Sequence, residues 1–242
     1  MYRVKLIRAL SMLLFSIGLL LGLALSTVAV WADIEAMRFD RGLTLLRDAS
    51  LSTLRCPVIL DSEKTGTVRA SIKNSLDRPV TLLIRAHVSR YLTLMREDVT
   101  RLRLEAGETQ SLEWAVDSED IVYEHLILVK VHQHRSYPLL GRTGSCGIVV
   151  LDLPGLTGPQ VVAGAVAGSL LGIALGLGLW LATARPLGAS NLEVVRAMGV
   201  VAASAVLVMI ASLLGWWLLG GLALIATLLL IGAVVGHFSA RR

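Results

Sequence analysis

The sequence contains few charged residues and few aromatic ones. Only 17% of its 242 residues are Asp, Glu, Lys or Arg, whereas 55% are hydrophobic and the mean hydropathy is +0.70. Soluble chains carry about 25% charged residues, so the composition excludes an ordinary soluble protein and predicts an integral membrane protein. The aromatic content of 5% argues against an outer-membrane barrel, which needs aromatic girdles.

Motifs of common enzymes are also missing. No G-x-S-x-G, H-E-x-x-H, Walker or G-x-G-x-x-G arrangement occurs at an expected strand-to-helix junction. We therefore expect no catalytic residue, no cofactor and no enzymatic activity. Ionisable side chains are absent from the apolar runs as well, which disfavours an ion-coupled transporter.

The net charge of +5 is distributed unevenly along the chain. Residues 33–158 hold 16 Lys and Arg against 17 Asp and Glu, a net charge of −1. The other cations flank apolar runs: Arg3, Lys5, Arg8, Arg185, Arg196, Arg241 and Arg242. Short basic flanks stay in the cytoplasm, so this charge predicts membrane insertion and no nucleic-acid partner. The 4 Lys against 19 Arg favour a GC-rich bacterial coding source.

Long apolar runs predict four transmembrane helices. Residues 9–31 would reach about 34 Å as a helix, enough for a hydrocarbon core of about 30 Å, and residues 161–184 form a similar run. Residues 197–236 would reach about 60 Å as one helix, so we expect a hairpin near Gly215 and the Gly220-Gly221 pair. Four tryptophans are predicted interface anchors: Trp31, Trp180, Trp216 and Trp217.

The predicted protein is a multi-pass plasma or inner membrane protein with both termini in the cytoplasm. Its predicted segments are a cytoplasmic N-terminus with the first transmembrane helix (1–32), an extracytoplasmic β-sandwich (33–158), a second helix (159–184), a cytoplasmic loop (185–196), a helical hairpin (197–236) and a cytoplasmic tail (237–242). A secretory signal cleaved at residues 30–32 is the alternative for the first helix, although signal cores have only about 7–15 apolar residues. Both interpretations send residues 33–158 outward.

Residues 33–158 change to short alternating runs between turn residues, a pattern that predicts strands. The runs occupy residues 67–72, 80–88, 99–104, 111–116, 123–131 and 147–153, with an earlier strand after Pro57. About seven short strands without a helical period are typical of a β-sandwich. The predicted fold class is therefore an α-helical membrane protein with four transmembrane helices and an inserted all-β extracytoplasmic sandwich.

The spacing of strands and turns resembles bacterial extracytoplasmic immunoglobulin-like or fibronectin-III-like modules. The resemblance lies in the strand after Arg55-Cys56-Pro57, the turn at residues 74–79, and the turn at 104–108 before Leu112-Glu113-Trp114. It covers about 100 residues and implies an immunoglobulin-like fold without a particular ligand. The sequence departs from antibody domains because Trp114 and the cysteines lack the diagnostic spacing.

Cys56 and Cys146 are the only cysteines, and both lie in the region expected outside the cytoplasm. Disulfides persist in such compartments, so we expect the two to bond and to tie the ends of the sandwich together. Closing a loop of this length is worth about 4–5 kcal/mol on the chain-entropy model. A metal-binding or redox pair is the alternative, but the C-x-x-C spacing is missing.

His132 and His134 share one face of a predicted strand and would supply half of a zinc or copper site. His125 has the opposite parity, and the sequence identifies no third ligand. We therefore expect no metal site, with His132 and His134 as the only candidates and a solvated strand end as the favoured interpretation.

Glycines recur at intervals of four in the second apolar run, at Gly164, Gly168, Gly172 and Gly176. In lipid, close backbone contact along such a ridge is a main source of packing energy. Matching pairs occur in the first and fourth helices: Gly18 with Gly22, and Gly232 with Gly236. The expected glycine zipper can form within the chain or against another subunit.

These observations favour a non-enzymatic membrane protein whose outer domain binds or positions a protein partner. The bilayer is one expected partner and a protein is the other, contacted by the outer domain or the helices, as for an accessory or structural subunit of a membrane assembly. Two alternatives stay open: a metal-dependent outer domain using His132 and His134, and an oligomeric channel built on the glycine ridges.

Overall fold

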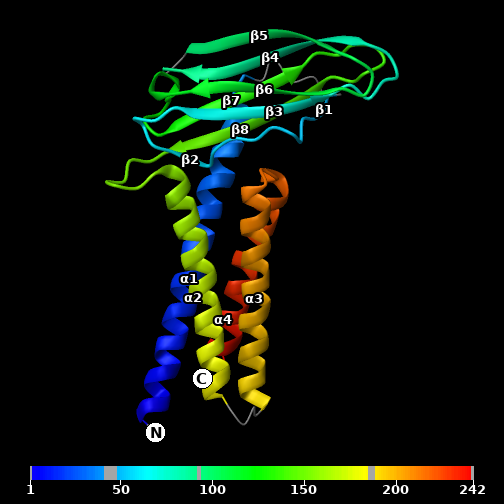
Figure 1. Ribbon diagram of the computed structural model, residues 1–242. Coiled ribbons are helices and arrows are strands. Elements are labelled where there is room, and N and C mark those ends of the chain that lie inside the picture. The colour runs from blue at the N-terminus through cyan, green and yellow to red at the C-terminus, as the bar shows by residue number, and fades with distance from the viewer. Residues whose placement is uncertain (1, 41–47, 92–93, 185–188, 241–242) are drawn as a thin grey trace. The chain divides into compact units, whose positions relative to one another are not determined.

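The computed structural model describes residues 2–40, 48–91, 94–184 and 189–240. The chain divides into two compact units. One consists of Met1–Val30 and Val162–Arg242, and the other of Trp31–Val161. The first unit is helical, and the second contains the strands (Figure 1).

Among the described residues the α-helices are α1 (Tyr2–Arg38), α2 (Gly158–Thr183), α3 (Ala189–Leu213) and α4 (Trp217–Ser239), and a short 3-10 helix spans Ser118–Asp120. Each is long and apolar enough to cross a membrane. The turn between α3 and α4 contains Gly215 at a φ of +72°, a left-handed conformation that favours glycine. Gly220 and Gly221 lie inside α4 instead of in this turn.

Two helix boundaries differ from those expected. Helix α3 begins at Ala189, so most of the segment expected as the loop 185–196 is helical, and residues 185–188 lie outside the described residues. Helix α1 continues to Arg38 instead of ending at residue 32. Residues 33–38 contain good helix formers and neither Gly nor Pro, so the charges there end the apolar run without ending the helix.

Helices α1 and α2 pack backbone against backbone in the helical unit. A Cβ added to Gly18 would lie 2.7 Å from the carbonyl oxygen of Ser169, and one added to Gly172 would lie 2.9 Å from the Cα of Gly18. The hydroxyl of Ser11 donates a hydrogen bond to the carbonyl of Gly176 at 2.7 Å. Larger side chains at these positions would force the two helices apart.

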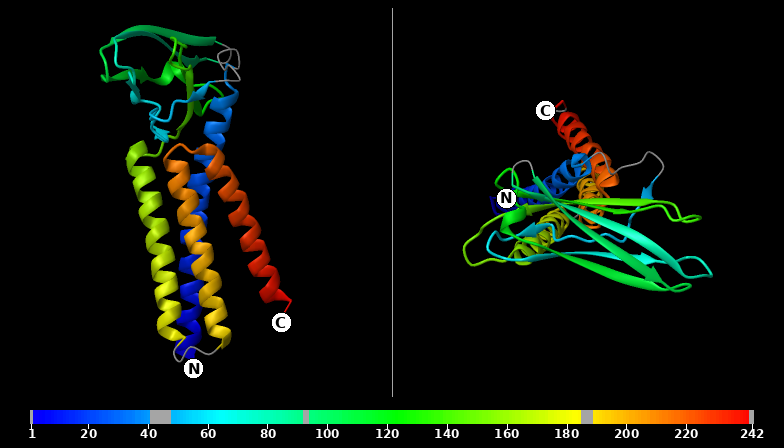
Figure 2. Two further views of the ribbon diagram at one scale, coloured as in Figure 1. Left: turned by 90° about the vertical axis from the view of Figure 1, so that its right-hand side faces the viewer. Right: turned by 90° about the horizontal axis from the view of Figure 1, so that it is seen from above.

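The other ridge glycines differ in their surroundings. Added Cβ atoms on Gly22 and Gly168 would meet Ser169 Oγ at 2.5 Å and Leu21 Cδ2 at 3.0 Å. Within the described part of the chain, Cβ atoms on Gly164, Gly232 and Gly236 would meet nothing within 4 Å. Helix α4 diverges from α3 towards its C-terminal end, which leaves the last two glycines uncovered (Figure 2).

The β unit contains two sheets (Figure 1). The larger has the order β1-β8-β7-β4-β5, with β2 pairing β8, and the smaller consists of β3 and β6. The strands are β1 (Ala49–Ser50), β2 (Ile59–Leu60), β3 (Gly66–Lys73), β4 (Val80–Arg90), β5 (Leu94–Leu104), β6 (Thr109–Val116), β7 (Leu126–Gln133) and β8 (Arg142–Val150). Strand β7 begins three residues later than expected because Tyr123 and Glu124 have positive φ angles, which place them in a turn.

One apolar core lies between the two sheets. The smaller sheet contributes Val68, Ile72 and Val116, none more than 1% exposed. The larger sheet contributes alternate residues of its strands, among them Leu82, Ile84, Val129, Val131 and Ile148. The period-two alternation in the sequence therefore follows the two faces of the strands.

The predicted fold class was wrong. About 49% of the residues are helical and 29% are in strands, in the order of one N-terminal helix, a sheet region and three further helices. The middle region is not an inserted all-β domain, because residues 31–38 of α1 belong to the β unit as helix. The apolar pattern alone did not indicate this extension, because Asp33, Glu35 and Arg38 interrupt the apolar run.

Replacing Gly172 with Leu tests the contact between α1 and α2. The added side chain would enter the space occupied by the Gly18 backbone, so we expect a loss of about 1–3 kcal/mol in stability. Thermal unfolding of the purified chain measures this loss. Gly164→Leu is the matched control because open space surrounds Gly164, and equal melting temperatures for both variants would contradict the packing.

Candidate functional site

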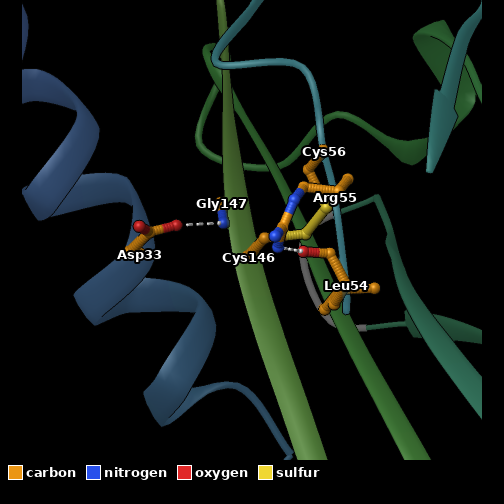
Figure 3. The surroundings of a disulfide bond; sticks show 6 residues. All are labelled: Asp33, Leu54, Arg55, Cys56, Cys146 and Gly147. Carbon is orange, nitrogen blue, oxygen red and sulfur yellow. Dashed lines mark hydrogen bonds between the residues drawn. A yellow bond between two sulfur atoms is a disulfide. The ribbon is translucent and has the colours of Figure 1, made fainter. Parts of the chain in front are cut away.

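The last turns of α1 pack against the larger sheet within the β unit. Ala32 and Ala36 are fully buried. A Cβ added to Gly147 of β8 would collide with the backbone of Ala32. Asp33 Oδ1 accepts a hydrogen bond from the Gly147 N–H at 3.1 Å (Figure 3). Two alanines and a glycine therefore allow helix and strand backbones to meet.

Lys130 of β7 reaches the C-terminal end of the same helix. Its ammonium donates to the carbonyls of Met37, Phe39 and Asp40, at 3.3, 2.7 and 3.0 Å. The last carbonyls of a helix have no partner within the helix and carry partial negative charge, so a buried cation stabilises them. Lys130 is only 2% exposed. The contact explains how strand β7 accommodates a lysine between two core valines.

Further polar side chains lie beside Lys130 on the same sheet face. Lys130 is the cross-strand partner of His87, which is the partner of Glu97. Directly opposed residues project from the same face. His87 Nδ1 lies 2.6 Å from Asp40 Oδ2, and His87 Nε2 lies 3.4 Å from Glu97 Oε1. The histidine therefore lies between two carboxylates from different elements.

His132 and His134 extend this cluster to its other end. The hydroxyl of Thr143 donates to Asp48 Oδ2 at 3.0 Å, and His132 Nδ1 lies 2.8 Å from the same hydroxyl. Because that hydroxyl proton is directed to Asp48, Nδ1 is the protonated nitrogen that donates to Thr143. The ring of His134 meets that of His132 edge-on, with centroids 4.5 Å apart. Burial lowers the pKa of both histidines, so both favour the neutral form.

Among the residues that the structure describes, His132 and His134 gain no third metal ligand. Across the described ranges, no group of three His, Cys, Asp or Glu side chains is arranged to hold a metal ion. His132 commits one nitrogen to Thr143, and Asp48 accepts from that same hydroxyl. The arrangement is that of a hydrogen-bonded polar cluster on the sheet face.

The expected disulfide between Cys56 and Cys146 is present, with Cα atoms 6.4 Å apart (Figure 3). Its place in the fold differs from the prediction. Cys146 lies inside β8, and Cys56 lies just before β2, which pairs with β8. The backbone of Arg55 forms an isolated antiparallel β-bridge with that of Arg69 in β3, which belongs to the smaller sheet. The segment from residue 55 to β2 therefore passes from the smaller sheet to the larger one. The disulfide holds this crossing segment.

The four tryptophans predicted as interface anchors lie in different surroundings. Trp31 belongs to the β unit and stacks on His125, with ring centroids 5.5 Å apart. In the helical unit, the Arg8 guanidinium lies 5.5 Å from the ring centroid of Trp180. Trp216 and Trp217 lie at the beginning of α4. Trp31 therefore belongs to the β unit, and the other three predicted anchors belong to the helical unit.

Sequence reasoning missed the residues that hold the helix end, namely Asp33, Asp40, His87 and Lys130. One feature of the sequence pointed to these contacts, namely the position of Lys130. Lys130 interrupts the run Leu128-Val129 and Val131, and a lysine among valines in a strand indicates a buried partner. The sequence could not identify the partner of Lys130, because this partner consists of backbone carbonyls at the end of a helix about 90 residues earlier.

Comparisons with known proteins identify no relatives in sequence. No protein-family model matches the chain, and no curated protein matches it. Among solved structures, it is similar to β-glucuronidase 2 of Bacteroides uniformis, with 19% identity and a TM-score of 0.30, covering 40% of this chain and 12% of that one. A β-glucosidase of Erythrobacter marinus has 15% identity and a TM-score of 0.32, covering 41% and 15%.

A third similar structure is the CARDB domain of a Pyrococcus furiosus protein, in complex with di-metal ions. It has 10% identity and a TM-score of 0.34, covering 41% of this chain and 90% of that domain. The chain spans less than a fifth of the length of either glycosidase. At these TM-scores, the likeness carries no argument about activity.

The lowered pKa of His132 and His134 predicts a pH-dependent stability. Both take up a proton at a lower pH in the folded chain than in the unfolded one, where histidine does so near pH 6.5, so stability falls as pH decreases below about 6.5. The slope is at most about 1.4 kcal/mol per pH unit for each histidine. Thermal unfolding between pH 7.5 and 5.5 measures it. A double His132→Gln and His134→Gln variant is expected to flatten the slope, and His125→Gln to keep it.

Removing the disulfide tests its contribution to the β unit. A Cys56→Ser and Cys146→Ser variant is expected to lose about 4–5 kcal/mol of unfolding free energy, because the unfolded chain regains the freedom of a 90-residue loop. Denaturant unfolding followed by intrinsic tryptophan fluorescence, to which buried Trp114 of the β unit contributes, gives the value. A reductant should destabilise the wild type and leave the variant unchanged. Coinciding transitions for both proteins would argue against a stabilising role.

Proposed function

We propose that this protein is a non-enzymatic integral membrane protein whose β unit lies outside the cytoplasm and binds a protein partner, as an accessory subunit of a membrane assembly. Three features support the proposal: the outward apolar surface of the helices, the positions in the sequence of the two bonded cysteines and the basic flanks, and an edge strand that pairs on one side only within the described residues.

The helices expose large apolar side chains on their outward surfaces. On α4, Leu222 is 58% exposed and Leu229 is 70% exposed. An apolar face of this extent is unfavourable in water and is the surface that a lipid-embedded helix presents. It supports insertion of the four helices in a bilayer.

The disulfide and the basic flanks support one orientation. Cys56 and Cys146 are bonded, and disulfides persist outside the reducing cytoplasm. The chain's unbalanced cations, such as Arg8 and Arg185, lie beyond the β unit in sequence, next to apolar runs. By the positive-inside rule such flanks stay cytoplasmic. Both arguments favour an extracytoplasmic β unit.

Strand β5 is the observation that carries the partner-binding proposal. It is 11 residues long, lies at the edge of the larger sheet, and within the described residues pairs only with β4. Leu94, Met95 and Val99 are 61%, 50% and 50% exposed. Long edge strands are usually protected against pairing with another chain. An edge strand with exposed apolar side chains can instead serve as a template for an added strand.

The chemistry of β5 defines the partner that it fits. Exposed charges of both signs alternate with the apolar residues, for example Glu97 and Arg101 beside Val99. Main-chain hydrogen bonds would give affinity, and alternate side chains would give specificity. We therefore propose an extended segment of another protein, with apolar side chains at alternate positions and mixed charges between them.

Site-directed photocrosslinking in the native membrane tests this proposal. A photoreactive side chain at Val99 is expected to give one discrete adduct with a second polypeptide, and the same group at exposed Glu63 is expected to give none. A Met95→Lys change on the same chain should reduce the adduct at least about threefold, since a charge at an edge opposes strand addition. Adducts of equal yield at both positions, or no adduct at Val99, would refute the partner site.

A further inference from the structure

Two cations lie near the beginning of α1, just before its apolar run. Lys5 is exposed and Arg8 is half-buried. Residues three apart lie on the same face of a helix, so the two positive charges are neighbours and repel each other. The ion pairs of the described residues include neither cation. The helical unit contains one acidic residue, Glu193 of α3, so this pair of cations favours an anion from outside the chain.

The Arg8 side chain is held between α1 and α2. Its Nη2 donates to the carbonyl of Thr183 at 3.2 Å, and its guanidinium carbon lies 5.5 Å from the ring centroid of Trp180. Thr183 is the last residue of α2, so its carbonyl has no partner within that helix. A cation over an aromatic face is attracted to the ring. These two contacts fix the position of the guanidinium, which reduces the entropy lost when it binds a ligand.

The two contacts leave donors of Arg8 without a partner. Among the described residues, neither Nε nor Nη1 makes a hydrogen bond, and Nε is buried whereas Nη1 is accessible. The indole Nε1 of Trp180 is likewise buried without a hydrogen-bond partner in the described part of the chain. Nη1 carries two N–H groups, which match the oxygens of a phosphate. The accessible side of the guanidinium is therefore suited to a phosphate group.

The position of these residues along the helices decides which anion is at hand. The charge-free run of α1 begins at residue 9, and Trp180 lies in the last turn of α2. Trp residues at the ends of transmembrane helices lie at the level of the lipid headgroups. Anionic lipids are present on the cytoplasmic side, and basic pockets between transmembrane helices on that side bind their headgroups.

We infer that Arg8 and Lys5 form a binding site for the phosphate of an anionic phospholipid headgroup. Nη1 of Arg8 donates to the phosphate oxygens, and the Lys5 ammonium supplies a second positive charge from the preceding turn. Trp180 and Thr183 hold the guanidinium in place. The inference rests on the proposed function, because it requires the helices to cross a bilayer with their basic flanks in the cytoplasm.

Native mass spectrometry of the purified full chain in mild detergent tests the site. The probes are phosphatidylglycerol and phosphatidylcholine with the same acyl chains. Phosphatidylglycerol is expected to bind at least about fivefold more tightly, since a basic residue at the surface contributes about that factor in affinity for anionic lipid. Equal binding of the two lipids would overturn the inference.

Inorganic phosphate separates a lipid site from a site for a free anion. Millimolar phosphate is expected to leave the phosphatidylglycerol adduct in place, because free phosphate lacks the acyl chains that hold the lipid against the helices. Complete displacement of the lipid by phosphate would assign the site to a free anion and overturn the lipid assignment.

Variants separate a lipid site from a structural role of Arg8. Lys5→Gln removes the charge of an exposed side chain, so it should lower the affinity for phosphatidylglycerol about fivefold and keep the melting temperature. Arg8→Gln should lower this affinity by at least the same factor. Arg38→Gln is the matched control, because it removes an exposed charge at the other end of α1 and should leave binding unchanged. Unchanged binding in both Lys5→Gln and Arg8→Gln would overturn the inference.

Alkaline carbonate extraction of native membranes distinguishes this inference from the proposed function. A chain that stays in the membrane but shows no preference for phosphatidylglycerol would overturn the lipid site alone. A chain that is released by carbonate would overturn membrane insertion, and the lipid site would fall with it.

Discussion

The β unit depends on the close approach of the last turns of α1 to strand β8. A helix and a sheet usually pack with large side chains between them, but here Ala32 lies against Gly147, so the two backbones meet. Such an approach leaves polar backbone groups away from water, and each needs a partner. Asp33 accepts from the Gly147 N–H, and Lys130 donates to the carbonyls at the helix end. The charged residues of this segment thus complete the contact that the small residues allow.

The helical unit uses the same constraint in an apolar setting. Gly18 and Gly172 bring α1 and α2 together, and the Ser11 hydroxyl is paired with the carbonyl of Gly176. In both units a glycine removes the side chain that would separate two backbones, and a nearby polar side chain binds the other segment's backbone. Helix α4 makes no such contact with the described residues at Gly232 and Gly236, so a shared spacing of glycines did not lead to a shared packing.

The sequence by itself determined which segments form apolar helices and strands and which cysteines pair, because these features depend on residue type and spacing. Charge-free runs longer than a bilayer core predicted long apolar helices, alternation predicted strands such as β3, β4 and β6, and the two cysteines predicted the disulfide. The tertiary structure decided where α1 ends, what Lys130 binds, and which glycines touch a neighbour. The physical reason is that periodicity tells which face a residue occupies, whereas the identity of the facing segment depends on contacts between residues far apart in the chain.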